Sequence, residues 1–372
     1  MSFVPASTPE RLTVSTPGRV CLFGEHQDYL GLPVIPCAIS RRITVEGIPR
    51  TDREAQLELP DIGSREHFPL GEVLPYDAER DYFRSAVNVL LRNGFVFRRG
   101  CDCTVRGNIP INSGTSSSSA LIVTWINFLA RLSDPPVVLP PAELARLAHA
   151  AEVLEFGEPG GKMDHYSTAF GGVLFLEFVP QVRVRQLTVP LGTFVLGDSG
   201  EPKDTKGILA RVKQGVLRVV ERLRQVDREF LLQTADQTSI DALAPHMTPA
   251  ETELLHGTIR NRDLTREALA LCDIPPFDHR RFGALLNEHH DVLRDILRIS
   301  TPKIDRMLRA AMEAGAYGGK INGSGGGGCM FAYAPEHPER VAAAVEREGG
   351  KAYVVSPDEG SRLETGAASW HP

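Results

Sequence analysis

A run of serines at residues 109–120 (IPINSGTSSSSA) has the composition of an anion-binding loop. Four consecutive serines stand directly before an apolar segment, and serine is a poor residue inside a helix but a good one at its N-terminal cap. The serine hydroxyls, the unpaired N–H groups of a first helical turn and the helix dipole would together bind a phosphate group. Plain capping of the helix explains the same serines equally well. The segment is not a Walker loop, because no Gly-Lys-Ser/Thr ending is present.

Two further loops combine glycine with a charged residue. Residues 157–164 (GEPGGKMD) end in Asp164, a lone carboxylate that could serve as a base but that, taken alone, more often caps a helix. Residues 323–328 (GSGGGG) hold five glycines in six positions, shortly after Lys320. Such a run is costly in backbone entropy, and it lies between two apolar, strand-like segments rather than in a linker. Close approach of the backbone to a ligand explains it better.

Residues 24–29 (GEHQDY) place three hydrogen-bonding side chains within four positions, directly after a strand-like segment that begins at Pro17-Gly18-Arg19. Glu25, His26 and Asp28 have weak spacing for a metal site. Their donors and acceptors suit the hydroxyl groups of a polyol. The alternative interpretation is a solvated turn.

The elements that must position these loops follow from the hydrophobic periodicity. The sequence predicts strands over residues 11–23, 33–45, 55–59, 101–105, 172–178, 193–198 and 329–333. It predicts helices over 81–93, 117–132, 141–156 and 302–314, within a region of long amphipathic helices from 205 to 316. Strands alternating with helices indicate an α/β or α+β fold. We expect two domains with a boundary near residue 190, so 1–190 and 191–372.

Composition excludes several classes of protein. The chain has 372 residues, a formal charge of −6 and 42% hydrophobic residues, which is ordinary for a globular protein and argues against a surface that coats nucleic acid. The longest apolar stretch, residues 121–132, is interrupted by Asn127 and Arg131 and is too short to span a bilayer. No basic-then-apolar leader is present, so we expect a cytoplasmic protein. Of the six cysteines only Cys101 and Cys103 lie close together, and we expect reduced thiols.

The order of four motifs resembles the GHMP kinase superfamily, which includes galactokinase, homoserine kinase and mevalonate kinase. The motifs are GRVCLFGEHQDY, PINSGTSSSSAL, GEPGGKMD and KINGSGGGGC, and the resemblance runs from about residue 15 to 333. Gly-Glu-His-x-Asp-Tyr and Met-Asp look like galactokinases and related sugar 1-kinases. The segments STAFGG, DSGEPKDTKG and residues 300–329 look at least as close to mevalonate kinases. The resemblance implies a two-lobed α+β (α/β) GHMP kinase fold, with an N-terminal lobe like ribosomal protein S5 domain 2 and a C-terminal ferredoxin-like lobe.

The resemblance also implies a role for individual residues. Asp164 would be the base toward the attacking hydroxyl, with Arg19 close enough to lower its pKa. Ser118 and Glu152 would bind Mg²⁺, which prefers oxygen ligands. The sugar would be held by Glu25, His26, Asp28 and Gly161. The ATP phosphates would contact Asn112, Ser113, Gly114, Thr115, Ser116, Ser117, Ser118, Ser119, Gly325 and Gly326.

We therefore expect an ATP- and Mg²⁺-dependent small-molecule kinase that phosphorylates a sugar hydroxyl, most simply the anomeric one. A mevalonate-type kinase is the enzyme alternative, and a non-catalytic sensor of sugar and ATP is the alternative from another class. The sensor is disfavoured because the serine run and Asp164 are both present. The expected partners are ATP and a small sugar or polyol, with no nucleic acid or membrane, for a monomer or homodimer.

Four positions depart from galactokinases, which typically have Thr, Asn, Gln and an apolar residue where this chain has Gln27, Leu30, His165 and Lys162. Lys162 could pair with the carboxylate of a uronic acid. The alternative is a solvent-facing loop lysine.

Overall fold

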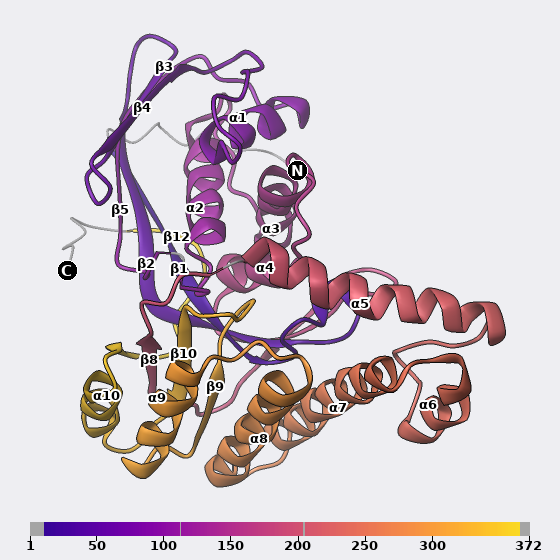
Figure 1. The fold of residues 1–372 in the computed structure, drawn as a ribbon. Coiled ribbons are helices and arrows are strands. Elements are labelled where there is room, and N and C mark those ends of the chain that lie inside the picture. Colours follow the sequence, from indigo (N-terminus) through magenta and orange to yellow (C-terminus); the bar gives the residue numbers. More distant parts are fainter. Residues whose placement is uncertain (1–10, 112, 204, 365–372) are drawn as a thin grey trace.

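The structure, a computed structural model, describes residues 11–111, 113–203 and 205–364 (Figure 1). Within these ranges the chain forms a mixed sheet of eight strands and an antiparallel sheet of four strands, with helices packed against both. The predicted α+β (α/β) class is confirmed.

The larger sheet has the order β12-β1-β2-β5-β3-β4, with β6 beside β2 and β7 beside β6. Only the β3–β5 pair is parallel among the pairs described. All twelve residues of β1 are buried, because β1 has a hydrophobic layer on each face. The strands are β1 (Leu12–Phe23), β2 (Ile35–Pro49), β3 (Glu54–Leu59), β4 (Ser64–Pro69), β5 (Cys101–Gly107), β6 (Val173–Glu177), β7 (Arg183–Leu187) and β12 (Arg362–Leu363).

Four helices cover one face of this sheet (Figure 1). The central helix, α2, buries Trp125 and Phe128 and is apolar on nearly every side, as its sequence predicts for a helix inside a core. The helix predicted over 141–156 changes geometry at Ala150, where a π-helical turn continues it to Leu154. The helix that carries Asp164 was not predicted. The helices are α1 (Tyr82–Arg92), α2 (Ser117–Leu132), α3 (Pro141–His149) and α4 (Met163–Phe170).

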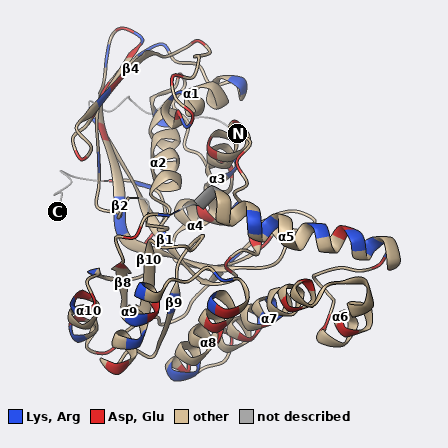
Figure 2. Cartoon of the chain, viewed as in Figure 1, with Lys and Arg blue, Asp and Glu red and all other residues tan. Residues whose placement is uncertain are grey.

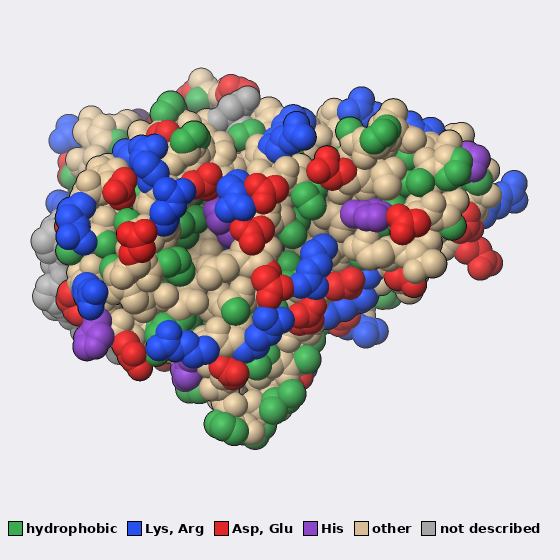
Figure 3. Space-filling view, turned by 60° about the horizontal axis from the view of Figure 1, so that its bottom comes forward, with side chains coloured by type: hydrophobic (Ala, Val, Ile, Leu, Met, Phe, Trp, Pro, Cys, Tyr) green, Lys and Arg blue, Asp and Glu red, His purple; other side chains and the backbone are tan. Residues whose placement is uncertain are grey.

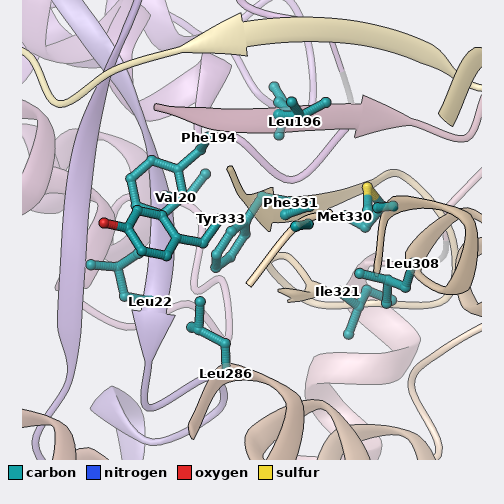
Figure 4. Close-up of a cluster of buried hydrophobic side chains, with 14 of the residues drawn as sticks. Val20, Leu22, Phe194, Leu196, Leu286, Leu308, Ile321, Met330, Phe331 and Tyr333 are labelled. Atoms are coloured by element: carbon teal, nitrogen blue, oxygen red, sulfur yellow. The ribbon is translucent and has the colours of Figure 1, made fainter. Parts of the chain in front are cut away.

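The smaller sheet has the order β11-β8-β10-β9 and packs against β1 from the other side. Figure 4 shows Val20 and Leu22 of β1 among side chains of β8 and β10, including Phe194 and Tyr333. Since successive side chains of a strand point to opposite faces, Cys21 instead joins the core below α2. The elements are β8 (Phe194–Asp198), β9 (Gly318–Ile321), β10 (Cys329–Tyr333), β11 (Lys351–Val355), α9 (Pro302–Glu313) and α10 (Pro338–Arg347).

The remaining helices extend to one side of the two sheets (Figure 1). All of them except α8 enclose a third apolar cluster that holds Leu30 and Leu32, so the loop after β1 is packed against α5 and α7. Basic residues recur along α5 (Figure 2), and one of them, Lys213, donates to the carbonyl of Pro159 at 3.1 Å. The helices are α5 (Thr205–Val226), α6 (Gln237–Leu243), α7 (Pro249–Cys272) and α8 (His279–Asp291).

The sheets change between β7 and β8, close to the predicted boundary at residue 190, but β12 returns to the first sheet. The division into 1–190 and 191–372 stays a prediction. None of the helices in the described ranges is long and apolar enough to cross a membrane. On the face shown in Figure 3, acidic and basic side chains are interspersed, unlike the continuous basic surface of a nucleic-acid-binding protein.

Candidate active site

One cavity of about 390 Å³ collects most of the residues that the sequence singles out. It opens between the loop after β1, the serine loop before α2, the glycine loop before α4 and the loop after β9. The predicted site residues that line it are Arg19, Glu25, His26, Asp28, Gly114, Ser116, Ser117, Ser118, Ser119, Glu152, Gly161 and Asp164.

Arg19 and Asp164 form a two-pronged ion pair in this cavity. Arg19 Nε donates to Asp164 Oδ1 at 2.8 Å and Arg19 Nη2 donates to Oδ2 at 2.7 Å. The arginine side chain is 5% exposed, whereas that of Asp164 is 29% exposed because it faces the cavity. Burial raises the pKa of Asp164, but the charge of Arg19 and the hydrogen bonds that the carboxylate accepts, from Arg19 among others, outweigh it, so the pKa lies below its ordinary value. The carboxylate is therefore ionised and accessible to a ligand.

The serines after Gly114 open α2 toward the cavity. Ser116 is the N-cap residue, with a left-handed backbone (φ 60°), and its side chain does not cap the helix. Capping therefore does not explain this hydroxyl. The N–H groups of the first turn have no partner within the helix, and such donors together with serine hydroxyls suit an anion; the phosphate-binding role of this loop stays a prediction.

Some predicted phosphate ligands lie behind the loop instead. Ser113 Oγ donates to the carbonyl of Pro110 at 2.8 Å and lies 2.8 Å from Thr115 Oγ1, so both hydroxyls serve the loop itself. Gly325 and Gly326 pack against Ile299 and Ile208. Ser113, Thr115, Gly325 and Gly326 are not among the described residues that line the cavity. From the glycine loop, Gly323 and Ser324 line it instead. Asn112 lies outside the described residues.

Glu25 lines the cavity and is also part of a buried network, and its role in holding a sugar stays a prediction. Its Oε2 accepts from Lys320 Nζ at 2.6 Å and its Oε1 accepts from the N–H of Gly323. The two charged side chains are 0% and 2% exposed. Glu25 therefore fixes the glycine loop against the loop after β1 at a place where it also lines the cavity.

His26 is held in one neutral tautomer. Its Nε2 lies 3.0 Å from the carbonyl of Ser324, which can only accept, so Nε2 carries the proton. Nδ1 then accepts from the hydroxyl of Tyr29 at 2.7 Å. Burial lowers the pKa of His26 to about 4, so the ring positions the loop without adding charge.

Asp28 brings a second carboxylate next to Asp164. Its Oδ1 accepts from the N–H of Tyr29 at 2.8 Å and its Oδ2 from the N–H of Met163 at 3.1 Å. A Cβ on Gly161 would lie 1.7 Å from Oδ2, so this close approach requires glycine. Burial raises the pKa of Asp28, and the nearby charge of Asp164 acts in the same direction.

Lys203 lines the cavity and was not predicted. Its side chain passes two glycine loops: a Cβ on Gly328 would lie 2.7 Å from Lys203 Cδ, and one on Gly114 would lie 2.8 Å from Nζ. Burial, then the charge of Arg19, lowers the pKa of Lys203 to about 8. The segment DSGEPKDTKG carries no spacing that marks this lysine.

Lys162, by contrast, is exposed and is not among the lining residues.

Two models of the same family match this chain. "GHMP kinases N terminal domain" matches residues 81–172 and "GHMP kinases C terminal" matches residues 266–352. A third model, "Galactokinase galactose-binding signature", matches residues 3–48. The chain belongs to the GHMP kinase family. This GHMP kinase is accordingly a phosphotransferase with an alcohol group as acceptor.

Relatives of this kinase fall into two groups. A mevalonate kinase of Thermococcus sibiricus is 28% identical over 369 residues, covering 95% of this chain and 98% of the relative. A galactokinase of Haemophilus influenzae is 29% identical over 344 residues, covering 87% and 85%. The solved structure of Lactococcus lactis galactokinase complexed with galactose aligns with a TM-score of 0.84 at 24% identity, covering 96% of each chain. The predicted family and two-lobed fold are confirmed.

Ser118 and Glu152 could hold a metal ion in this GHMP kinase. Both line the cavity. Glu152 Oε2 accepts from His165 Nε2 at 2.8 Å, with the histidine side chain 2% exposed, and this bond fixes the carboxylate. The described residues contain no cluster of three or more histidine, cysteine or acidic ligands. A carboxylate and a hydroxyl alone fit Mg²⁺, which takes few protein ligands and completes its shell with water and phosphate oxygens.

Proposed function

We propose that this chain is an ATP- and Mg²⁺-dependent sugar 1-kinase of the galactokinase type, which transfers the γ-phosphoryl group to the anomeric hydroxyl of a small sugar. The observation that carries the proposal is the pair of carboxylates, Asp164 and Asp28, in one cavity. One suits the reacting hydroxyl and the other suits a neighbouring ring hydroxyl, because ionised carboxylates accept hydrogen bonds from hydroxyl donors.

The remaining lining residues supply what phosphoryl transfer requires, which is mainly positioning and neutralisation of charge. Asp164 accepts the proton of the attacking hydroxyl, and Arg19 holds the carboxylate in place. The serine loop and the first turn of α2 bind the phosphates, and Lys203 provides a positive charge on the same side of the cavity. Mg²⁺ bound by Ser118 and Glu152 would neutralise phosphate charge.

A mevalonate-type kinase is the second candidate, because mevalonate kinases match 95% of this chain and the glycine loop resembles theirs. Mevalonate carries a carboxylate. Asp28, beside Asp164, would repel a substrate anion bound at that point. Lys162 is exposed and does not line the cavity, so it offers no compensating charge there. Beside Asp28 and Asp164 the local negative charge therefore favours a neutral polyol, while Lys203 lies by the serine loop, on the side proposed for the phosphates.

The proposal is tested by measuring ATP consumption with purified protein against galactose, other hexoses, uronic acids, heptoses, inositols and mevalonate. Phosphorus NMR of the product then locates the phosphate. We expect a neutral sugar to be phosphorylated on its anomeric oxygen. Phosphorylation of mevalonate alone would overturn the proposal in favour of the second candidate.

Replacing Asp28 by alanine should raise the KM for the sugar and leave the KM for ATP nearly unchanged. A hydrogen bond to a charged group contributes about 1.5–3 kcal/mol, which predicts an increase of about 10- to 100-fold. Steady-state kinetics with each substrate varied in turn measures the effect. Lys162→Met is the matched loop control and should leave both constants unchanged, because Lys162 is exposed. An unchanged sugar KM in Asp28→Ala would remove Asp28 from the sugar site.

Replacing Ser118 by alanine should raise the Mg²⁺ concentration needed for half-maximal activity, because one oxygen ligand is lost. Ser133→Ala is the control at the other end of α2. Its hydroxyl bonds to the carbonyls of Ala130 and Pro135, so its loss affects stability alone. Titrating Mg²⁺ at saturating ATP separates the two variants. Identical Mg²⁺ dependence of Ser118→Ala and wild type would make this serine a helix-terminal residue only.

A further inference from the structure

Asn322 joins three segments that meet behind the cavity. It follows β9 directly and its side chain is fully buried. Its Oδ1 accepts from the N–H of Cys21 at 2.9 Å, and its Nδ2 donates to the carbonyl of Gly114 at 2.8 Å. Its own N–H donates to the carbonyl of Cys329 at 2.9 Å. The side chain and backbone of Asn322 thus connect β1, the serine loop and the hairpin formed by β9 and β10.

The bond to Cys21 fills a gap in the large sheet. On its outer edge β1 pairs with β12 at Val14 and Ser15. Further along the same edge, the N–H of Arg19 donates to the carbonyl of Thr115 at 3.1 Å, and the N–H of Cys21 is taken by Asn322. A buried backbone N–H without an acceptor is costly. Asn322 and the serine loop therefore take the place of a neighbouring strand.

The bond to Gly114 reaches the catalytic pair. The carbonyl of Gly114 accepts from Asn322 Nδ2 and also from Arg19 Nη1. The other two nitrogens of the same guanidinium hold both oxygens of Asp164. The place of Arg19 in front of Asp164 thus depends on where the Gly114 carbonyl is held. That carbonyl is fixed from one side by Asn322.

We propose that Asn322 is a positioning residue for phosphoryl transfer, which sets the Arg19–Asp164 pair through the carbonyl of Gly114. The amide is suited to this task because it presents a donor and an acceptor without charge. Aspartate has the same shape but no donor, and it would place a carboxylate against a carbonyl oxygen. A displacement of about 1 Å in a reacting group can lower a rate by about 100-fold, so a loosened carbonyl should reduce turnover.

A purely structural role for Asn322 would lower stability and leave turnover unchanged. Asn88 in α1 is the matched control, because it is also buried and its amide also accepts from a backbone N–H and donates to a backbone carbonyl. Its Oδ1 accepts from the N–H of Leu74 at 2.8 Å and its Nδ2 donates to the carbonyl of Leu74 at 2.9 Å. Neither Asn88 nor Leu74 is among the lining residues. Asn88→Asp and Asn322→Asp therefore remove the same kind of donor at different places.

The experiment compares Asn322→Asp, Asn322→Ser and Asn88→Asp by Tm and by steady-state kinetics. We expect all three to lower the Tm. Only the variants at 322 should lower kcat, by about 10- to 100-fold for Asn322→Asp. The fall should be smaller for Asn322→Ser, because the serine hydroxyl can still form one of the two hydrogen bonds. The KM values should stay within about three-fold of wild type. A kcat within about two-fold of wild type in both variants at 322 would overturn the inference. If Asn322→Asp does not fold, the serine variant decides in the same way.

The inference rests on the proposed role of Arg19 and Asp164, and the assay uses whichever acceptor the wild type phosphorylates. A wild type that accepts mevalonate alone would overturn the sugar proposal. The comparison of the Asn322 and Asn88 variants would still test the positioning role of Asn322, because it needs only an acceptor that the wild type phosphorylates.

Discussion

Replacing Asp164 by asparagine should lower kcat by about 10²–10⁴-fold, the range expected for loss of a positioned base. The amide has the shape of the carboxylate but cannot accept the proton of the attacking hydroxyl. Nucleotide and sugar binding should be retained, because the serine loop and Asp28 are unchanged. Rapid-quench or steady-state kinetics at saturating substrates measures the fall. Turnover of Asp164→Asn within a few-fold of wild type would rule out the base role.

The pH dependence gives a second check on the same group. Burial raises the pKa of Asp164 and Arg19 lowers it, with the net pKa below the ordinary value. The ionised base should therefore persist as pH falls, and activity should be limited by Asp164 only in strongly acidic solution. In Arg19→Met the burial remains and the compensating charge is gone, so the pKa should rise and the acid limb of kcat should move to higher pH. An acid limb that does not move would contradict the pairing.

The residues that could be predicted from sequence belong to short segments with their own chemical signal. The serine run opens a helix whose apolar content is unambiguous, and α2 begins at Ser117 as predicted. Asp164 was identified from its place at the end of a glycine loop and from the order of motifs. The helix that carries it, α4, has serine and threonine among its eight residues and no strong apolar repeat. Its chemistry was therefore easier to predict than its secondary structure.

Contacts between distant segments could not be predicted, because no local pattern encodes them. Glu25 was interpreted as a sugar ligand from its neighbours in GEHQDY, yet its partner Lys320 lies 295 positions further along the chain. Lys203 reaches the cavity only because two glycine loops leave room for it. The glycines themselves were interpreted too uniformly: Gly323 lines the cavity, whereas Gly325 and Gly326 pack against isoleucines. The strands β4 and β7 were missed because their sequences are polar and largely exposed.

Replacing Lys320 by methionine should destabilise the fold by about 3–5 kcal/mol, because it leaves the carboxylate of Glu25 buried without its cation. Both side chains are essentially inaccessible, at 0% and 2% exposure. Methionine fills most of the volume of lysine, so packing around Phe331, over which the ammonium group lies, is largely kept. Urea unfolding measures the loss of unfolding free energy, with the slope of this free energy against urea concentration compared between variants.

The double variant Lys320→Met/Glu25→Gln separates the charge from the packing. It removes both charges and leaves an amide that still accepts from the N–H of Gly323, so most of the lost stability should return. Arg65→Met is the surface control. Its partner Glu58 lies at 3.0 Å but the two side chains are 82% and 61% exposed, so the expected cost is about 0–1 kcal/mol. The buried charge pair does not hold the two loops together if the unfolding free energy lost in the double variant equals the sum of the losses in Lys320→Met and Glu25→Gln. A loss in Lys320→Met no larger than that in Arg65→Met would show the same. Coupled losses would mean that the glycine loop is held at the cavity by electrostatics, since Glu25 is the residue that binds both Lys320 and the N–H of Gly323.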